Sequence, residues 1–325
     1  MKAPRLTKMH RFHSLVLATV MTVALPVIAL AESHSIRQFE IEGINVTGAN
    51  DRCGEPVMRY QVEKIPDFPL AEDFGGSFVG AFNSDGDDAL PLTPENCDDD
   101  TVLVTHTDDD FLAGLGLPEA DVRILNIPLR EVPINVAPFE LRSAVPPSRV
   151  ASPNPFPPTK SEPTTPIRLG GWLSTRGNMT IKCRDNGPAW VRISFENLIP
   201  NGIYTMWGLW GTTAPGAPGP SLVPVPFGGV PNAFVPGRGG RAVFTRRLPA
   251  CPMDTTPDGS VLFFVSTAYH SDGSLYGATP ELPFVEHQFV DANGNPFVSV
   301  LPPGVVDHDQ MNFPINSVPI QNDDR

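Results

Sequence analysis

Three histidines near the C-terminus are the first candidates for chemistry. His270 precedes a Ser-Asp-Gly turn that contains Asp272, His287 follows in the next apolar run, and His308 begins the sequence His-Asp-Gln-Met. Neutral imidazoles that converge with a carboxylate bind copper or zinc. These four residues define a candidate copper or zinc site; the alternative is that the histidines are surface groups or hydrogen-bonding partners. A blue-copper site is strongly disfavoured, because the nearest upstream cysteine, Cys251, lies 57 residues before His308.

Acidic turns in the N-terminal third are candidates for calcium. Asp85 and Asp87 alternate with Asn83 in a glycine-containing segment, and calcium prefers oxygen ligands from such loops. The EF-hand pattern fails, because Asp88 stands where that loop needs glycine and Pro94 stands where it needs glutamate. A looser calcium site at Asp85 and Asp87 stays open, beside the alternative that these aspartates form turns and favour solubility.

All four tryptophans lie within 39 residues, at positions 172, 190, 207 and 210. Exposed aromatic rings suit contacts with sugars or partner proteins, and the candidate binding residues are Trp207, Trp210, Phe227 and Phe234. Residues 211–240, around the last two, hold seven prolines and eight glycines, which favours a long loop acting as a lid or contact surface. The alternatives are that these rings belong to the core and that the loop only packs onto it.

Recognisable catalytic motifs are absent from the sequence. It contains no G-x-S-x-G, H-E-x-x-H or P-loop pattern. A triad of Ser266, His270 and Asp272 is hard to build, since Ser266 and His270 would lie about 13 Å apart along one strand. A pair of carboxylates that catalyses glycoside hydrolysis remains an alternative, because the separation of two carboxylates depends on the fold.

Short apolar runs with period-two alternation indicate antiparallel strands in the C-terminal half. In the clearest run, Val191, Ile193 and Phe195 alternate with polar residues, as in a strand with one buried face. Residues 203–210 are apolar on both parities, which predicts a central strand covered on both sides. Seven strands in this half predict an antiparallel Greek-key β-sandwich of the immunoglobulin or fibronectin-III type. Their expected ranges are 179–183, 191–195, 203–210, 241–248, 261–270, 284–290 and 310–315.

The segment Leu198-Ile-Pro-Asn-Gly-Ile-Tyr204 resembles the tyrosine corner of fibronectin-III-like sandwiches. The resemblance implies that the Tyr204 hydroxyl bonds the backbone a few residues upstream and fixes a crossing between two sheets. It covers only this segment, and it implies architecture rather than activity.

A proline-rich stretch divides the chain. Residues 143–166 contain eight prolines, which is typical of an extended linker or a surface strap. We therefore expect a smaller, acidic β-rich domain at 32–142 and the sandwich domain at 167–325. Strands of the first domain are expected at 39–46, 57–62, 77–82, 102–107 and 122–129. The 38 prolines and 28 glycines of the chain leave little room for long helices, and the predicted fold class is all-β.

The cysteines indicate an oxidising location. All four, Cys53, Cys97, Cys183 and Cys251, lie beyond residue 31, and no C-x-x-C pair is present. Three pairings are possible. We favour Cys53–Cys97 and Cys183–Cys251, because each pair then lies within one expected domain.

Residues 1–31 are typical of a signal peptide. A basic start precedes an uncharged apolar run at 14–30, and Ala29-Leu30-Ala31 supplies the pattern for cleavage. The alternative is an uncleaved membrane anchor, although the apolar run is short and contains Pro26. The sequence therefore predicts a secreted or periplasmic protein that is not inserted in a membrane after cleavage.

Charge narrows the class of partner. The formal net charge is −13, and residues 32–325 carry 19 basic against 36 acidic side chains, which argues against nucleic acid and anionic membranes. We expect a non-enzymatic binding protein that uses the sandwich loops to contact a partner protein or a glycan and needs no cofactor. The alternatives are a periplasmic copper- or zinc-binding protein, a calcium-binding protein, and an extracellular enzyme of unspecified type.

Overall fold

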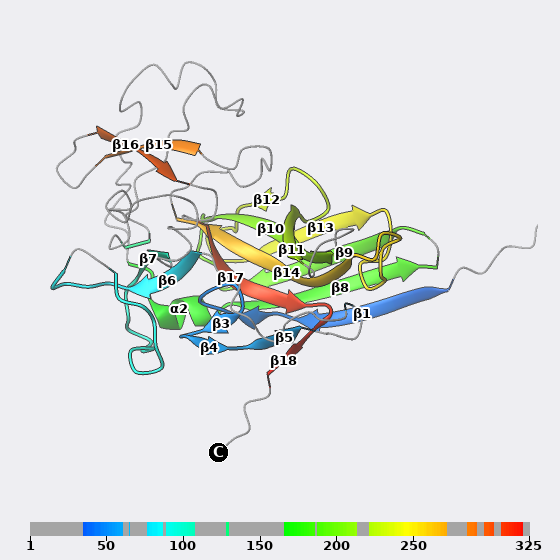
Figure 1. Ribbon diagram of the computed structural model, residues 1–325, viewed down its shortest axis with the longest axis horizontal. Helices are drawn as coiled ribbons and strands as arrows, with labels where there is room; N and C mark the ends of the chain where they lie inside the picture. The colour runs from blue at the N-terminus through cyan, green and yellow to red at the C-terminus, as the bar shows by residue number, and fades with distance from the viewer. Residues whose placement is uncertain are drawn as a thin grey trace, which may run out of the picture. The chain divides into compact units, whose positions relative to one another are not determined.

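The computed structural model describes residues 35–60, 65, 77–86, 89–107, 128–129, 166–185, 187–212, 221–271, 285–290, 296–301 and 307–320. In these ranges the chain forms several antiparallel sheets and one short helix, α2 (Leu169–Leu173) (Figure 1). The prediction of an all-β protein is therefore confirmed. The expected signal peptide and nearly all of the proline-rich stretch lie outside the described residues.

Sheet A contains four strands in the order β1-β8-β9-β13. Residues alternate between buried and exposed along β8 and β9, which confirms the alternation expected around Val191. One face of sheet A therefore packs on the core and the other is exposed to solvent. The strands are β1 (Ile36–Glu42), β8 (Arg176–Arg184), β9 (Ala189–Glu196) and β13 (Ala242–Leu248).

Sheet B is larger, and its centre is covered on both faces. Its order is β11-β10-β14-β17-β2, with β12 also paired to β10. All ten residues of the central strand β14 are buried, as expected for a strand that packs on both sides. The strands are β2 (Ile44–Asn45), β10 (Ile203–Thr212), β11 (Ser221–Pro226), β12 (Ala233–Phe234), β14 (Val261–His270) and β17 (Asp307–Pro314).

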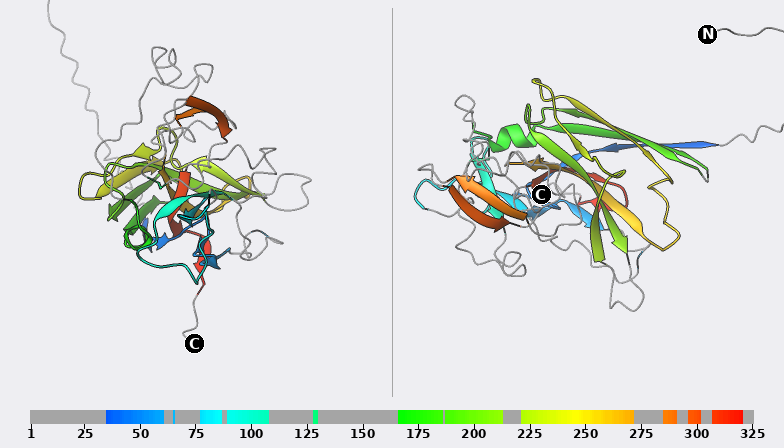
Figure 2. Two further views of the ribbon diagram at one scale, coloured as in Figure 1. Left: turned by 90° about the vertical axis from the view of Figure 1, so that its left-hand side faces the viewer. Right: turned by 90° about the horizontal axis from the view of Figure 1, so that it is seen from above.

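The inner faces of the two sheets share one apolar core. Met179, Ile193 and Phe195 from sheet A belong to the same buried cluster as Tyr204 and Phe313 from sheet B. The right-hand view of Figure 2 shows the two sheets as separate layers, with β1 and β8 in one and β14 and β17 in the other. The arrangement is sandwich-like, because each sheet buries its apolar face against the other.

The two layers approach each other closely at Gly177. A Cβ atom on this residue would lie 2.4 Å from Sδ of Met311 and 2.8 Å from the ring of Phe313. Both of those side chains come from β17 and are fully buried. Glycine at position 177 therefore lets β17 pack directly against the backbone of β8.

Four shorter strand pairs complete the described part of the fold. One of them joins the N-terminal and C-terminal parts of the chain, because β5 pairs with β18 near the C-terminus. The pairs are β3 (Asp51–Arg52) with β4 (Glu55–Pro56), β5 (Met58–Tyr60) with β18 (Ser317–Pro319), β6 (Ser77–Ala81) with β7 (Leu103–Thr107), and β15 (Val285–Val290) with β16 (Pro296–Leu301).

These pairings run across the boundary between the domains expected at 32–142 and 167–325. β1 is the edge strand of sheet A beside β8, and β2 pairs with β17 in sheet B. Residues 35–325 accordingly form one unit. The physical reason is that strands from the N-terminal part supply hydrogen-bonded edges for sheets built from the C-terminal part.

Both predicted disulfides are confirmed. Cys53 is bonded to Cys97 and Cys183 to Cys251, with Cα–Cα distances of 5.9 and 5.2 Å. Disulfides persist in oxidising compartments, which places the folded protein outside the cytoplasm. In the described part of the chain, no helix has the length and apolar character needed to cross a membrane.

The long loop expected at 211–240 is also corrected. β11 makes six antiparallel residue pairs with β10, and β12 pairs with the start of the same strand. The Asn232 side chain is fully buried and donates to the backbone carbonyl of Met206 at 2.8 Å. Apolar residues of this segment pack onto the sheet, so its described part is an extension of sheet B.

Candidate functional site

The exposed face of sheet A is the candidate functional site. Side chains alternate across a strand, so the register of the four strands sets the outward residues in rows. We call this surface the charged sheet face. From one end to the other its rows are Gln38–Lys182–Trp190–Arg247, then Glu40–Thr180–Arg192–Thr245, then Glu42–Asn178–Ser194–Val243.

Trp190 is the aromatic centre of this face. Its side chain is 39% exposed although it lies in the middle of a sheet. The guanidinium of Arg184 lies 5.0 Å from the indole centroid and that of Arg247 lies 5.9 Å from it. Both separations permit cation–π attraction, so the indole holds two guanidinium groups on a surface that stays open.

Positive charge accumulates on this face of an acidic protein. Six cations and three carboxylates are exposed there, in a chain whose net charge is −13. Within the described ranges, no carboxylate forms an ion pair with Lys182, Arg192 or Arg247. These cations are therefore available to an anionic ligand. The cations are Arg176, Lys182, Arg184, Arg192, Arg241 and Arg247, and the carboxylates are Glu40, Glu42 and Glu196.

The Glu40 carboxylate is hydrogen-bonded by uncharged side chains. It accepts a hydrogen bond from the Thr180 hydroxyl at 2.8 Å and another from the Gln38 amide at 3.0 Å. Both contacts lie on the β1 side of the face. The carboxylate keeps its negative charge, but in the described ranges it forms no ion pair with a cation of β8, β9 or β13.

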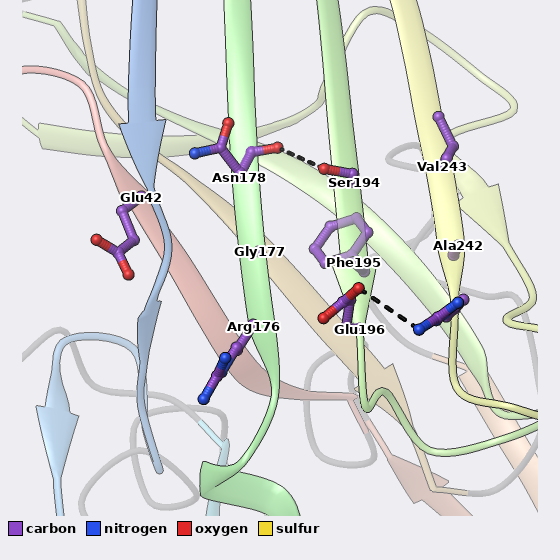
Figure 3. Close-up of a pocket in the computed structure, with 10 residues that line it drawn as sticks. Glu42, Arg176, Gly177, Asn178, Ser194, Phe195, Glu196, Ala242 and Val243 are labelled. Carbon is purple, nitrogen blue, oxygen red and sulfur yellow. Dashed lines mark hydrogen bonds and ion pairs between the residues drawn. The ribbon is translucent and has the colours of Figure 1, made fainter.

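Two hollows lie side by side along the charged sheet face. The first, about 620 Å³, is lined by Lys182, Trp190, Arg192 and Arg247. The second, about 710 Å³, is lined by residues of all four strands and is drawn in Figure 3. Figure 3 shows Glu42, Asn178, Ser194 and Val243 side by side on neighbouring strands, with Arg176 and Glu196 at the end of the same hollow.

The predicted copper or zinc residues do not meet in the described structure. His308 is the register partner of Tyr269 and shares its face of sheet B, whereas His270 follows Tyr269 and points to the opposite face. Asp272 lies outside the described residues, and for His287 only the backbone of β15 is described. In the described ranges, no group of three or more His, Cys, Asp or Glu side chains is arranged to hold a metal ion.

The two described histidines are instead buried and neutral. Nε2 of His270 lies 2.8 Å from the hydroxyl of Thr205, which also accepts the indole N–H of Trp207 at 2.8 Å. Burial lowers the pKa of His270 to about 4. Burial, with a smaller contribution from His270, lowers the pKa of His308 to about 3. These environments suit hydrogen-bonding histidines.

The predicted aromatic binding residues lie in or against the core. Phe227 is 2% exposed, and Phe234 stacks on the rings of Phe195 and Tyr204 at 5.4 and 5.5 Å. Trp210 also packs against the core between the sheets. Trp207 packs against the cluster on the other face of sheet B. None of the four presents an open ring comparable to Trp190.

The predicted calcium residues are described only in part. Asp85 is exposed, and its backbone N–H donates to Oδ1 of Asn83 at 3.0 Å. This contact is typical of an Asx turn, the role offered as the alternative to calcium binding. Asp87 lies outside the described residues.

The sequence did contain a signal for the charged sheet face. The alternation that buries Val191 and Phe195 also places Trp190 and Arg192 on the solvent side of β9. The contribution of Lys182 and Arg247 was not predictable, because it depends on which strands flank β9 and in what register.

Comparison with known proteins does not assign a family or a function to the charged sheet face. No family model matches the sequence, and no curated protein is significantly similar to it.

Proposed function

We propose that this protein is a secreted or periplasmic, non-enzymatic binding protein whose charged sheet face binds an anionic partner. This proposal moves the working surface from the loops expected from the sequence to the open side of sheet A. The expectation of an extracytoplasmic location is supported by the two disulfides and by the leader-like residues 1–31.

A single observation carries the proposal. Trp190 lies in one cross-strand row with Lys182 and Arg247 and holds the guanidinium of Arg184 over its ring. Arginine forks bind carboxylate, sulfate or phosphate oxygens with two parallel hydrogen bonds, and stacking keeps the fork in position. Exposed cations that outnumber the carboxylates around them repel one another, and an anionic ligand relieves that repulsion.

The scaffold for this surface is proposed as a Greek-key sandwich of the immunoglobulin or fibronectin-III type. The chain passes between the sheets from β9 to β10, from β12 to β13 and from β13 to β14. The Tyr204 hydroxyl also accepts the backbone N–H of Ile199 at 2.9 Å, as the resemblance to a tyrosine corner implies.

Retention on immobilised heparin tests the proposed function. We expect the protein to be retained at low salt despite its negative charge, and the double variant Lys182→Glu/Arg247→Glu to flow through. The matched control is Arg52→Glu/Arg59→Glu, which makes the same charge change at exposed residues outside sheet A and should be retained like the wild type. Flow-through of the wild type, or equal loss in the control, would overturn the proposal.

A further inference from the structure

We propose that the anionic partner is a polysaccharide in which acidic and neutral sugars alternate, with the acidic sugar at Trp190 and the neutral sugar near Asn178 and Ser194. This inference rests on the proposed function of the charged sheet face and assigns its ligand class and orientation.

The two ends of the face differ in charge. Four exposed cations surround the Trp190 end, and Glu40 is the one carboxylate of the face that lies among them. The other end has two of each sign, and there Nη2 of Arg241 lies 3.8 Å from Oε1 of Glu196. An anionic group is therefore favoured at one end and a neutral group at the other. The cations of the first end are Lys182, Arg184, Arg192 and Arg247; the charged residues of the second are Glu42, Arg176, Glu196 and Arg241.

The Trp190 end fits an acidic sugar. Guanidinium forks and an ammonium group bind a carboxylate, while the exposed edge of the indole packs against the apolar face of a sugar ring. Lys182 and Arg247 flank Trp190 on the neighbouring strands, about 4.8 Å away on either side. A carboxylate bound beside the edge of the indole is therefore within reach of both cations.

The Asn178 end fits neutral sugars. Asn178 and Ser194 are exposed register partners, and an amide beside a hydroxyl offers both donors and acceptors to sugar hydroxyls. Trp190 and Ser194 are four residues apart on β9, or about 13 Å. This distance spans a few sugar rings, so a short oligosaccharide lying along the strands reaches both hollows.

Charge distribution favours this ligand over other anionic polymers. A nucleic acid carries a phosphate at every residue and would place several beside Glu42 and Glu196. A protein partner is disfavoured because interface cores are poor in charged residues, whereas this face is rich in them. A second copy of this acidic chain is the remaining candidate, and sedimentation distinguishes it.

Calorimetric titration of the wild-type protein tests the inference. The probes are hyaluronan oligosaccharides, in which uronic acid alternates with a neutral amino sugar, together with oligogalacturonate, chitin oligosaccharides and oligo(dT). We expect hyaluronan oligosaccharides to bind most tightly. Trp190→Ala and Arg247→Ala should each weaken that binding at least tenfold, and Asn178→Ala severalfold. Arg59→Ala, an exposed cation on β5, should change it less than twofold.

Each other outcome overturns the inference. Tighter binding of oligo(dT) or oligogalacturonate than of hyaluronan oligosaccharides would reject a ligand with alternating acidic and neutral sugars. The charged sheet face would then still be an anion-binding surface. If chitin oligosaccharides, which are neutral, bound as tightly as hyaluronan oligosaccharides, the assignment of an acidic sugar to Trp190 would be rejected. Binding to heparin alone would reject the alternation of acidic and neutral sugars. A dimer in sedimentation that Arg247→Glu dissociates would reject a polysaccharide ligand. Loss of all anion binding, including that to heparin, would also overturn the proposed function.

Discussion

The hydroxyl of Tyr204 donates a 2.7 Å hydrogen bond to Oε1 of Gln310, and this bond links β10 to β17 across the intervening strand β14. A bulge in β17 makes the bond possible. The register shifts between Thr267 and Ala268, whose partners are Met311 and Asp309, so Gln310 is the extra residue. Such a bulge re-aims the side chain, here toward the core between the sheets.

Removing the Tyr204 hydroxyl should destabilise the fold. In Tyr204→Phe the buried backbone N–H of Ile199 and the buried Oε1 of Gln310 both lose this partner. A buried polar group without a partner costs about 1–3 kcal/mol. We expect a loss of about 2–4 kcal/mol in the free energy of unfolding, measured by urea titration.

A double-mutant cycle with Gln310→Met isolates the Tyr204–Gln310 bond. The two substitutions should be less than additive, because each removes the same hydrogen bond. Strict additivity would mean that the bond contributes nothing to stability.

Gly177→Ala should also destabilise the protein, through a different mechanism. The added methyl group would collide with Met311 and Phe313, and overpacking of a core costs about 1–3 kcal/mol. Thermal unfolding measures the effect. The matched control is Gly171→Ala in α2, where a Cβ meets no atom within 4 Å; that variant should be as stable as the wild type or more stable. Equal melting temperatures for the two variants would contradict the close approach of the sheets.

Local patterns in the sequence predicted the strands but not their partners. The alternation around Val191 gave β9, and apolar residues on both parities gave β10 as a covered strand. The pairing of β1 with β8 was not predictable, because it joins segments about 140 residues apart in sequence and no local rule specifies so distant a neighbour.

The candidate site was likewise predictable only in its local features. Period-two alternation places Trp190 outward, yet it does not say whether the outward face is open or covered. His270 and His308 appeared able to converge because both lie at strand ends. Their separation onto opposite faces follows from the register of β17 with Tyr269, and a shift of one residue would reverse it.

Acidification should destabilise the protein through its two buried histidines. Burial keeps His270 and His308 neutral in the folded state, with pKa values of about 4 and about 3, whereas the unfolded chain takes up protons below about pH 6.5. More protons are then bound by the unfolded state, so stability falls as the pH falls. Each histidine contributes a slope of about 1.4 kcal/mol per pH unit between its two pKa values.

His270→Gln tests this source of acid sensitivity. Glutamine keeps a group able to bond Thr205 but takes up no proton. We expect unfolding free energies that fall less steeply than those of the wild type between pH 6 and pH 4, measured by urea titration at several pH values. A variant with the wild-type slope would show that His270 is protonated equally in the folded and unfolded states.

Asp309→Asn should shift stability in the opposite direction. Burial raises the pKa of the Asp309 carboxyl to about 6, although a hydrogen bond from Ser266 opposes the shift. The folded state therefore holds a proton that the unfolded state has lost, and this group destabilises the fold as the pH rises from about 4 to 6. Asparagine removes the titration and still accepts from Ser266. Relative to the wild type, the free energy of unfolding of the variant should rise by up to about 3 kcal/mol between pH 4 and pH 8.

Asp258→Asn is the matched control for this prediction. Asp258 is exposed, and hydrogen bonds from Thr256 and Ser260 lower its pKa. Its charge therefore stabilises the fold above its ordinary pKa and ceases to do so as the pH falls. The control variant should lose stability relative to the wild type at pH 8 and approach it at low pH. Parallel pH profiles for Asp309→Asn and the wild type would show that the Asp309 carboxyl is not enclosed on this face of sheet B.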